Sequence, residues 1–145
     1  MKQFAVAMLL VVGVILVGCG SNSKSGNING TWNATLMGNN NSTVFSFATS
    51  LVENGDGSLN ITNFQFTTSS PCFASGETES GSFGLSGNFN GQVSGSFGMS
   101  VMSGVPSGNN LMLTGTVAGN TISGKWNLTG SGGCTGSGTF VMNKT

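Results

Sequence analysis

From Gly30 onward, apolar side chains alternate with small polar ones at a period of two residues. This alternation is typical of β-strands that bury one face, and helical spacing is absent from the region. The chain from residue 30 to 145 is therefore predicted to be all β. Four sets of residues are predicted to share a buried face, namely Trp32, Ala34 and Leu36; Phe45, Phe47, Thr49 and Leu51; Val93, Gly95, Phe97, Met99 and Val101; and Leu111, Leu113, Gly115 and Val117.

One segment breaks the alternation. Leu59 and Ile61 are in phase with each other, whereas Phe64 and Phe66 are out of phase by one position. An extra residue in one strand of an antiparallel pair forms a β-bulge and changes the phase in this way. The sequence therefore predicts a bulge at residue 62 or 63.

Clusters of glycine and asparagine separate the apolar runs, and such residues supply the positive φ that tight hairpins need. They divide the chain into about eight strands joined as consecutive hairpins, and closing such a sheet removes its exposed edges. We predict one small up-and-down antiparallel barrel, with a two-sheet β-sandwich as the alternative. The turn signals lie at residues 54–57, 90–91, 119–120 and 132–133, with connections at 38–42 and 104–109. Glycines within the strands, which permit sharp coiling, are Gly87, Gly95, Gly115 and Gly124.

The first part of the chain has a different pattern. Lys2 gives a positively charged start, and the 14 residues from Phe4 to Val17 carry no charged or polar side chain. A helix of that length covers about 21 Å, less than the roughly 30 Å hydrocarbon core of a bilayer. The pattern indicates an export signal rather than a transmembrane helix.

This segment ends in Leu16-Val17-Gly18-Cys19, which resembles the lipobox of bacterial lipoproteins. The resemblance implies that the Cys19 thiol takes a diacylglyceryl group, that the signal peptide 1–18 is removed, and that the freed amine is acylated too. In that family, an aspartate directly after the cysteine retains the lipoprotein in the inner membrane. This chain has Gly20 at that position, so the resemblance implies delivery to the outer membrane. An ordinary secretory signal is the alternative.

Residues 19–29 form the predicted tether between the lipid and the domain at 30–145. Apart from Cys19, Ile28 and Lys24 they are glycine, serine and asparagine, so they are expected to be flexible and to span about 17 Å. Two or three acyl chains hold a protein on a bilayer stably, because each buried methylene contributes about 0.8 kcal/mol. The predicted partner is therefore a membrane of the cell envelope, on its periplasmic or surface face.

Two cysteines remain beside Cys19, namely Cys72 and Cys134, in a chain predicted to reach an oxidising compartment. Such pairs form disulfides. A bridge over this span would constrain the unfolded chain by about 4 kcal/mol. Free buried thiols and intermolecular pairing are the alternatives.

Gly30-Thr31-Trp32 resembles the Gly-x-Trp motif of lipocalin and avidin-like barrels. In lipocalins this tryptophan closes one end of the barrel beneath an arginine from a late strand, and the resemblance implies an interior that binds a small apolar ligand. The stretch 28–33 recurs at 122–127, which predicts that Trp32 and Trp126 lie near each other as core residues or as ligand-stacking ones. The candidate ligand-binding residues are Trp32, Phe45, Phe47, Phe97 and Trp126.

Charge and chemistry limit the function further. The chain has four basic and four acidic residues, no histidine and a net charge of zero. Nucleic-acid binding needs several cations to neutralise phosphates, so it is excluded. General acid-base and nucleophilic catalysis most often use histidine, and the Gly-x-Ser-x-Gly motif does not occur. We expect no catalytic residue, metal or cofactor.

The acidic residues have two candidate arrangements. Glu77 and Glu79 would share one side of a strand, as a catalytic or calcium-binding carboxylate pair would. Their Ser/Gly-rich surroundings favour a solvated loop or strand edge near Cys72 instead. Residues 53–57 are faintly similar to a calcium loop. A hairpin turn explains them better.

Two functions fit these predictions. A monomeric, non-catalytic envelope protein with a filled barrel would have a structural or surface-interaction role, because a barrel of about eight strands is just wide enough to be filled. The alternative is lipocalin-like binding of a small apolar ligand in the barrel interior.

Overall fold

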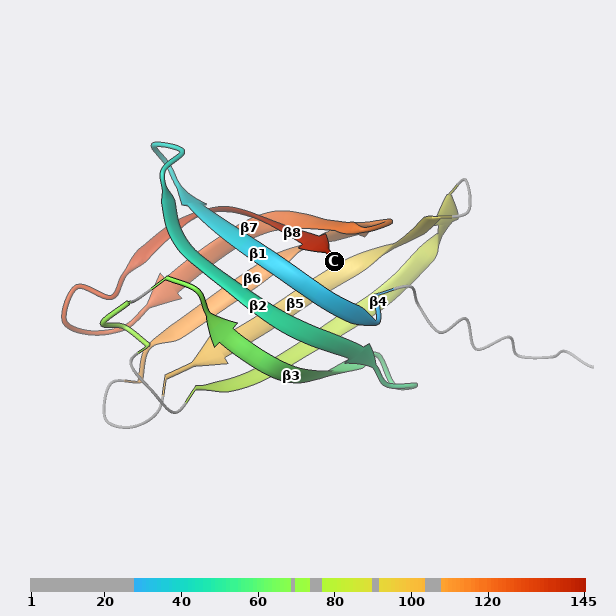
Figure 1. Ribbon diagram of the computed structural model, residues 1–145, viewed down its shortest axis with the longest axis horizontal. Coiled ribbons are helices and arrows are strands. Elements are labelled where there is room, and N and C mark those ends of the chain that lie inside the picture. Colours follow the sequence, from blue (N-terminus) through green and yellow to red (C-terminus); the bar gives the residue numbers. More distant parts are fainter. Residues whose placement is uncertain (1–27, 69, 74–76, 90–91, 104–107) are drawn as a thin grey trace, which may run out of the picture.

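The computed structural model describes residues 28–68, 70–73, 77–89, 92–103 and 108–145. Eight antiparallel strands form a closed barrel in sequence order (Figure 1). The predicted up-and-down barrel is confirmed, and the sandwich alternative is wrong. The predicted signal peptide, Cys19 and the tether up to residue 27 lie outside the described residues. The strands are β1 (Gly30–Gly38), β2 (Thr43–Glu53), β3 (Ser58–Phe66), β4 (Thr78–Phe89), β5 (Gln92–Met102), β6 (Asn110–Ala118), β7 (Thr121–Thr129) and β8 (Gly136–Lys144).

The inner face of the barrel follows the predicted alternation. Every residue of the four predicted sets is buried except Gly115, which is half-buried. Burying these side chains is the main favourable term for the fold, at about 25 cal/mol per Å² of apolar surface. The outer face carries mainly serine, threonine, asparagine and glycine.

The predicted bulge lies at Asn63. The ladder between β2 and β3 shifts register by one residue at this point, and Asn63 has a φ of 52°. Asparagine tolerates this left-handed conformation better than most residues do. The extra residue returns Phe64 and Phe66 to the inner face, where their ring centroids lie 4.8 and 6.0 Å from that of Phe47.

The predicted turns are confirmed where the structure describes them. Gly57 and Gly119 have φ of 84° and 61°, and Gly132 and Gly133 also have positive φ. The predicted turn at 90–91 and residues 104–107 of the longer connection lie outside the described residues.

The two ends of the barrel differ. One end, here called the Ile28 end, holds the start of β1 and the last residues of β2, β4 and β6; it lies to the right in Figure 1. The other end, here called the disulfide end, lies at the left and holds the last residues of β1, β3, β5 and β7 and the Cys72–Cys134 bond. Across the described ranges no helix is long and apolar enough to span a bilayer.

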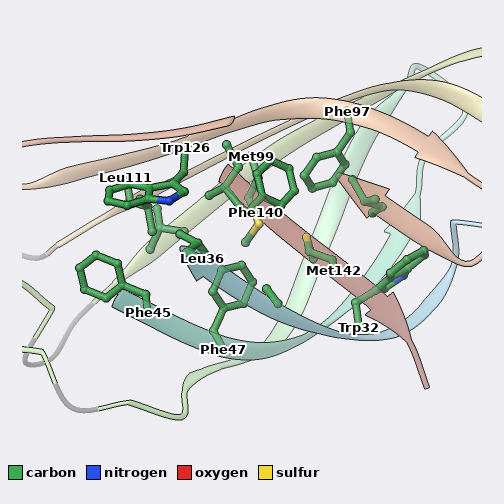
Figure 2. Close-up of a cluster of buried hydrophobic side chains, with 14 of the residues drawn as sticks. Trp32, Leu36, Phe45, Phe47, Phe97, Met99, Leu111, Trp126, Phe140 and Met142 are labelled. Carbon is green, nitrogen blue, oxygen red and sulfur yellow. The ribbon is translucent and has the colours of Figure 1, made fainter. Parts of the chain in front are cut away.

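The two tryptophans lie at opposite ends, so the prediction that they are neighbours is wrong. Trp126 pairs with Gly138, which in turn pairs with Gly38, six residues along β1 from Trp32. Six residues of a strand span about 20 Å. Strands of a barrel are staggered against one another, so matched positions in two strands do not share a level. Figure 2 shows the separation.

One ladder of the barrel is short. β3 and β4 pair only at Ser58 with Ser82 and Leu59 with Gly81, whereas β4 and β5 pair at 11 positions. Beyond these two pairs, toward the disulfide end, the ladder between β3 and β4 does not continue. We call the facing edges, residues 60–66 of β3 and 78–80 of β4, the β3–β4 seam.

Candidate binding site

Large side chains pack against one another in the middle of the barrel. Phe47 and Phe97 are 1% and 4% exposed, and the Phe97 ring centroid lies 6.2 Å from that of Phe140. Met99 and Met142 are buried with them (Figure 2). Two of the five predicted ligand-binding residues, Phe47 and Phe97, are therefore part of the packed core.

Trp32 closes the Ile28 end. Its side chain is fully buried, and its indole Nε1 donates a hydrogen bond of 2.7 Å to the carbonyl oxygen of Ile28. The Lys144 Nζ lies 6.0 Å from the ring centroid, at the outer limit of a cation–π contact. Lys144 is the last residue of β8 and the register partner of Trp32 on β1. Lys144 is the one basic residue of β8, and this was the feature of the sequence that could have marked it as a contact of Trp32.

Phe45 and Trp126 come together at the disulfide end. Their ring centroids are 6.0 Å apart with the rings edge to face, and the Trp126 Nε1 donates a 2.9 Å hydrogen bond to the carbonyl oxygen of Met37. Both side chains line a pocket of about 290 Å³, together with Leu128 and residues of the β3–β4 and β7–β8 connections. We call it the mouth pocket. Of the five predicted residues, these are the two that the structure brings to one site.

The predicted disulfide between Cys72 and Cys134 is confirmed. It ties the β3–β4 connection to the β7–β8 connection at the edge of the mouth pocket, with the two Cα atoms 5.6 Å apart. Asn109, which is 2% exposed, supports the same place: its Nδ2 donates to the Cys72 carbonyl and its Oδ1 accepts from the Ser131 amide, at 2.9 and 3.2 Å. Nothing in the sequence distinguished Asn109 from the many other asparagines.

Phe73 adds a second ring to this end. It stacks on Phe66 with centroids 5.0 Å apart and meets Phe45 edge to face at 6.1 Å. Phe73 lies outside any alternating run, so the sequence pattern did not mark it as a core residue. Through Phe73, the connection that follows β3 joins the barrel core.

Residues 53–57 form the predicted hairpin turn. The Asn54 amide donates to the Ser58 carbonyl at 2.8 Å, and the Asp56 carboxylate accepts from the Ser58 hydroxyl and amide at 2.6 and 2.9 Å. These two hydrogen bonds, the hydroxyl one first, hold the pKa of Asp56 below its ordinary value. Among the described residues, no three histidine, cysteine or acidic side chains gather into a metal-ligand set.

Glu79 lies at a strand edge, as predicted, but faces the inside of the barrel. It pairs with Val101, which is fully buried, and directly paired residues share a face. Its side chain is half-buried rather than solvated. Partial burial, and then the neighbouring charge of Glu77, raise the pKa of the Glu79 carboxyl above its ordinary value.

Comparisons with protein-family models, with curated proteins and with solved structures found no match. The function proposed below therefore depends on the chemistry and geometry of this chain.

Proposed function

We propose that this protein is a lipid-anchored lipoprotein of a bacterial cell envelope, with no catalytic activity and with a structural or surface-interaction role. The lipobox-like Leu16–Cys19 segment supports the anchor, and Gly20 supports delivery to the outer membrane. The absence of histidine from the sequence supports a non-catalytic function, and the zero net charge argues against a nucleic-acid partner.

The observation that carries the proposal is the packed core between the two ends of the barrel. Rings and methionines from several strands contact one another there, with Phe47 and Met142 at most 1% exposed. A core of this kind makes the barrel a scaffold, so contacts with other molecules would be made by its outer surface and its ends.

The two ends would have different surroundings. The tether that begins at Cys19 leads into Ile28 and β1, so the Ile28 end would lie nearer the membrane. The disulfide end, with the mouth pocket and the β3–β4 seam, would then face away from the lipid. This orientation places the less regular end of the molecule where partners can reach it.

The anchor is tested by replacing Cys19 with alanine in cells that express the full chain. We expect the unaltered protein in the membrane fraction, with an amino-terminal Cys19 that carries acyl groups by mass spectrometry, and the Cys19→Ala protein unacylated. Identical unacylated products from both would refute the proposed anchoring.

A small apolar ligand at the mouth pocket is a second candidate, supported by the exposed space beside Phe45 and Trp126. Its volume of about 290 Å³ is close to the lower end of the roughly 300–1,000 Å³ range of ligand sites. Titration with an apolar fluorescent probe would show saturable binding that Trp126→Phe weakens and Trp32→Phe leaves unchanged. Absence of saturable binding would remove this candidate.

A further inference from the structure

The β3–β4 seam leaves backbone groups at two facing strand edges. The ladder ends after the Leu59–Gly81 pair, although β3 continues to Phe66 and β4 begins at Thr78. A strand edge without a partner presents a row of N–H and C=O groups that another extended chain can pair with. Among the described strands, the β3–β4 seam is the place where strand edges lack a paired neighbour.

Apolar side chains line the seam from β3. Ile61, Phe64 and Phe66 face the core but are half-buried, whereas the inner-face residues of β5 are buried. The ladder missing between β3 and β4 accounts for this exposure. Ile61 reaches toward the other strand, because a Cβ placed on Gly81 would lie 3.2 Å from the Ile61 Cδ1.

The described part of the β3–β4 connection runs elsewhere. Cys72 is bonded to Cys134 of the β7–β8 connection, and its carbonyl accepts a hydrogen bond from Asn109. Phe73 packs on Phe66 and Phe45, at the disulfide end. These contacts hold residues 70–73 at the mouth of the barrel rather than along the seam.

The β4 side of the seam is acidic. Glu79 projects from its inner face, and Glu77 is close enough to raise the pKa of the Glu79 carboxyl. These two residues are half of the four acids in the chain. The lysines of the described strands, Lys125 and Lys144, lie on β7 and β8, away from the seam. The seam therefore combines an apolar side with a negatively charged one.

A carboxylate at this place opposes folding, since partial burial disfavours its charged form. Features that lower stability are frequent at functional sites, where they serve binding. Lysine and arginine fit both sides of the seam, because their methylene stems cover apolar surface while their charged ends reach a carboxylate.

We propose that the β3–β4 seam binds an extended segment of a partner protein, which adds as a strand and directs basic side chains inward over Phe64 toward Glu79. This inference names the partner chemistry of the surface-interaction role proposed above and rests on it. Backbone hydrogen bonds at the two edges provide the binding, and the inward lysine or arginine provides the selectivity.

The test uses the full chain in detergent micelles and a fluorescent seven-residue peptide of alternating threonine and lysine. We expect saturable binding by fluorescence anisotropy, and binding weakened by about tenfold in the Glu79→Gln variant and with a threonine–glutamate peptide, as for loss of a partly buried charge pair. Glu53→Gln is the matched control, because it removes an acid near the Ile28 end, and it should leave the affinity unchanged. No binding, or equal affinity for both peptides, would overturn the proposal.

Strand addition is tested separately with a peptide in which proline replaces every threonine, because proline lacks the N–H donor. We expect this peptide not to bind, and we expect the lysine peptide to slow amide hydrogen exchange at residues 60–66. Equal binding of the proline peptide, or binding without slower exchange, would mean that the seam selects cationic amphiphiles rather than a strand, and would overturn the proposal. Membrane localisation is measured independently, so a negative result here leaves the proposed anchoring standing.

Discussion

Gly138 lies where the indole of Trp126 passes over β8. A Cβ at this position would lie 2.8 Å from the Trp126 Nε1 and would also collide with the backbone carbonyl of Met37. The missing side chain lets Nε1 reach that carbonyl and complete the hydrogen bond that holds the indole beside the mouth pocket.

Gly138→Ala should therefore destabilise the protein by at least about 2 kcal/mol, since a fixed backbone carbonyl cannot yield to the added methyl group. Chemical denaturation measures the change. Gly55→Ala is the control, because a Cβ there meets no heavy atom within 4 Å. Equal effects of the two substitutions would contradict the tight contact at Gly138.

Trp32→Phe tests the closure of the Ile28 end. The substitution removes the donor to the Ile28 carbonyl and leaves a gap where a fully buried indole lay. We expect a loss of about 2–3 kcal/mol in the free energy of unfolding. Val52→Ala, at a side chain 45% exposed, should change it by less than about 0.5 kcal/mol.

Local alternation was enough to predict the inner faces and the bulge, because the phase of side chains along one strand depends only on that strand. The positions of Trp32 and Trp126 along the barrel axis could not be predicted from local alternation. They depend on the stagger that accumulates around the barrel, and that stagger appears only when all the strands are paired.

At the level of the strand, Asn63 determines which way the end of β3 faces. Asn63→Val should cost about 1–2 kcal/mol, because a β-branched residue is disfavoured at its positive φ. Asn63→Gly should be close to neutral, since glycine adopts this conformation freely. Thermal unfolding of the two variants distinguishes them, and equal melting temperatures would argue against a conformational requirement.

The disulfide links two connections that no strand pairing joins directly. Replacing Cys72 and Cys134 together by serine should lower the free energy of unfolding by about 4 kcal/mol, as loop-closure entropy gives for residues 62 apart. Urea denaturation measures the difference. A loss below about 1 kcal/mol would show that the two connections stay together in the unfolded state without the bond.

The eight strands could be predicted because each has its own repeat and its own turn residues. The packing of the connections could not, since Phe73 and Asn109 belong to no periodic run and their partners are remote in sequence. The seam was also beyond prediction. Whether Glu79 faces solvent or the inside of the barrel depends on its pairing with β5 and on the end of pairing with β3.

For the whole molecule, Glu79 makes stability depend on pH. The raised pKa means that the unfolded chain ionises first, near the ordinary value of 4.5, so the folded state loses stability as pH rises from there through the folded pKa. The Glu79→Gln variant has no carboxyl to ionise at this position, so it does not lose stability in this way. At pH 7 we expect it to melt at a higher temperature than the unaltered protein, and at pH 3 we expect the two melting temperatures to be equal. A lower melting temperature of the variant at pH 7 would contradict the raised pKa.

The barrel closes between β1 and β8, the two strands farthest apart in sequence. During synthesis, β1 leaves the ribosome long before the strand it must pair with exists. Its edge and the indole of Trp32 stay uncovered for that time, and contacts between such remote segments form slowly. A nascent chain of this architecture is therefore the form most in need of a chaperone, and it remains so until β8 has been made.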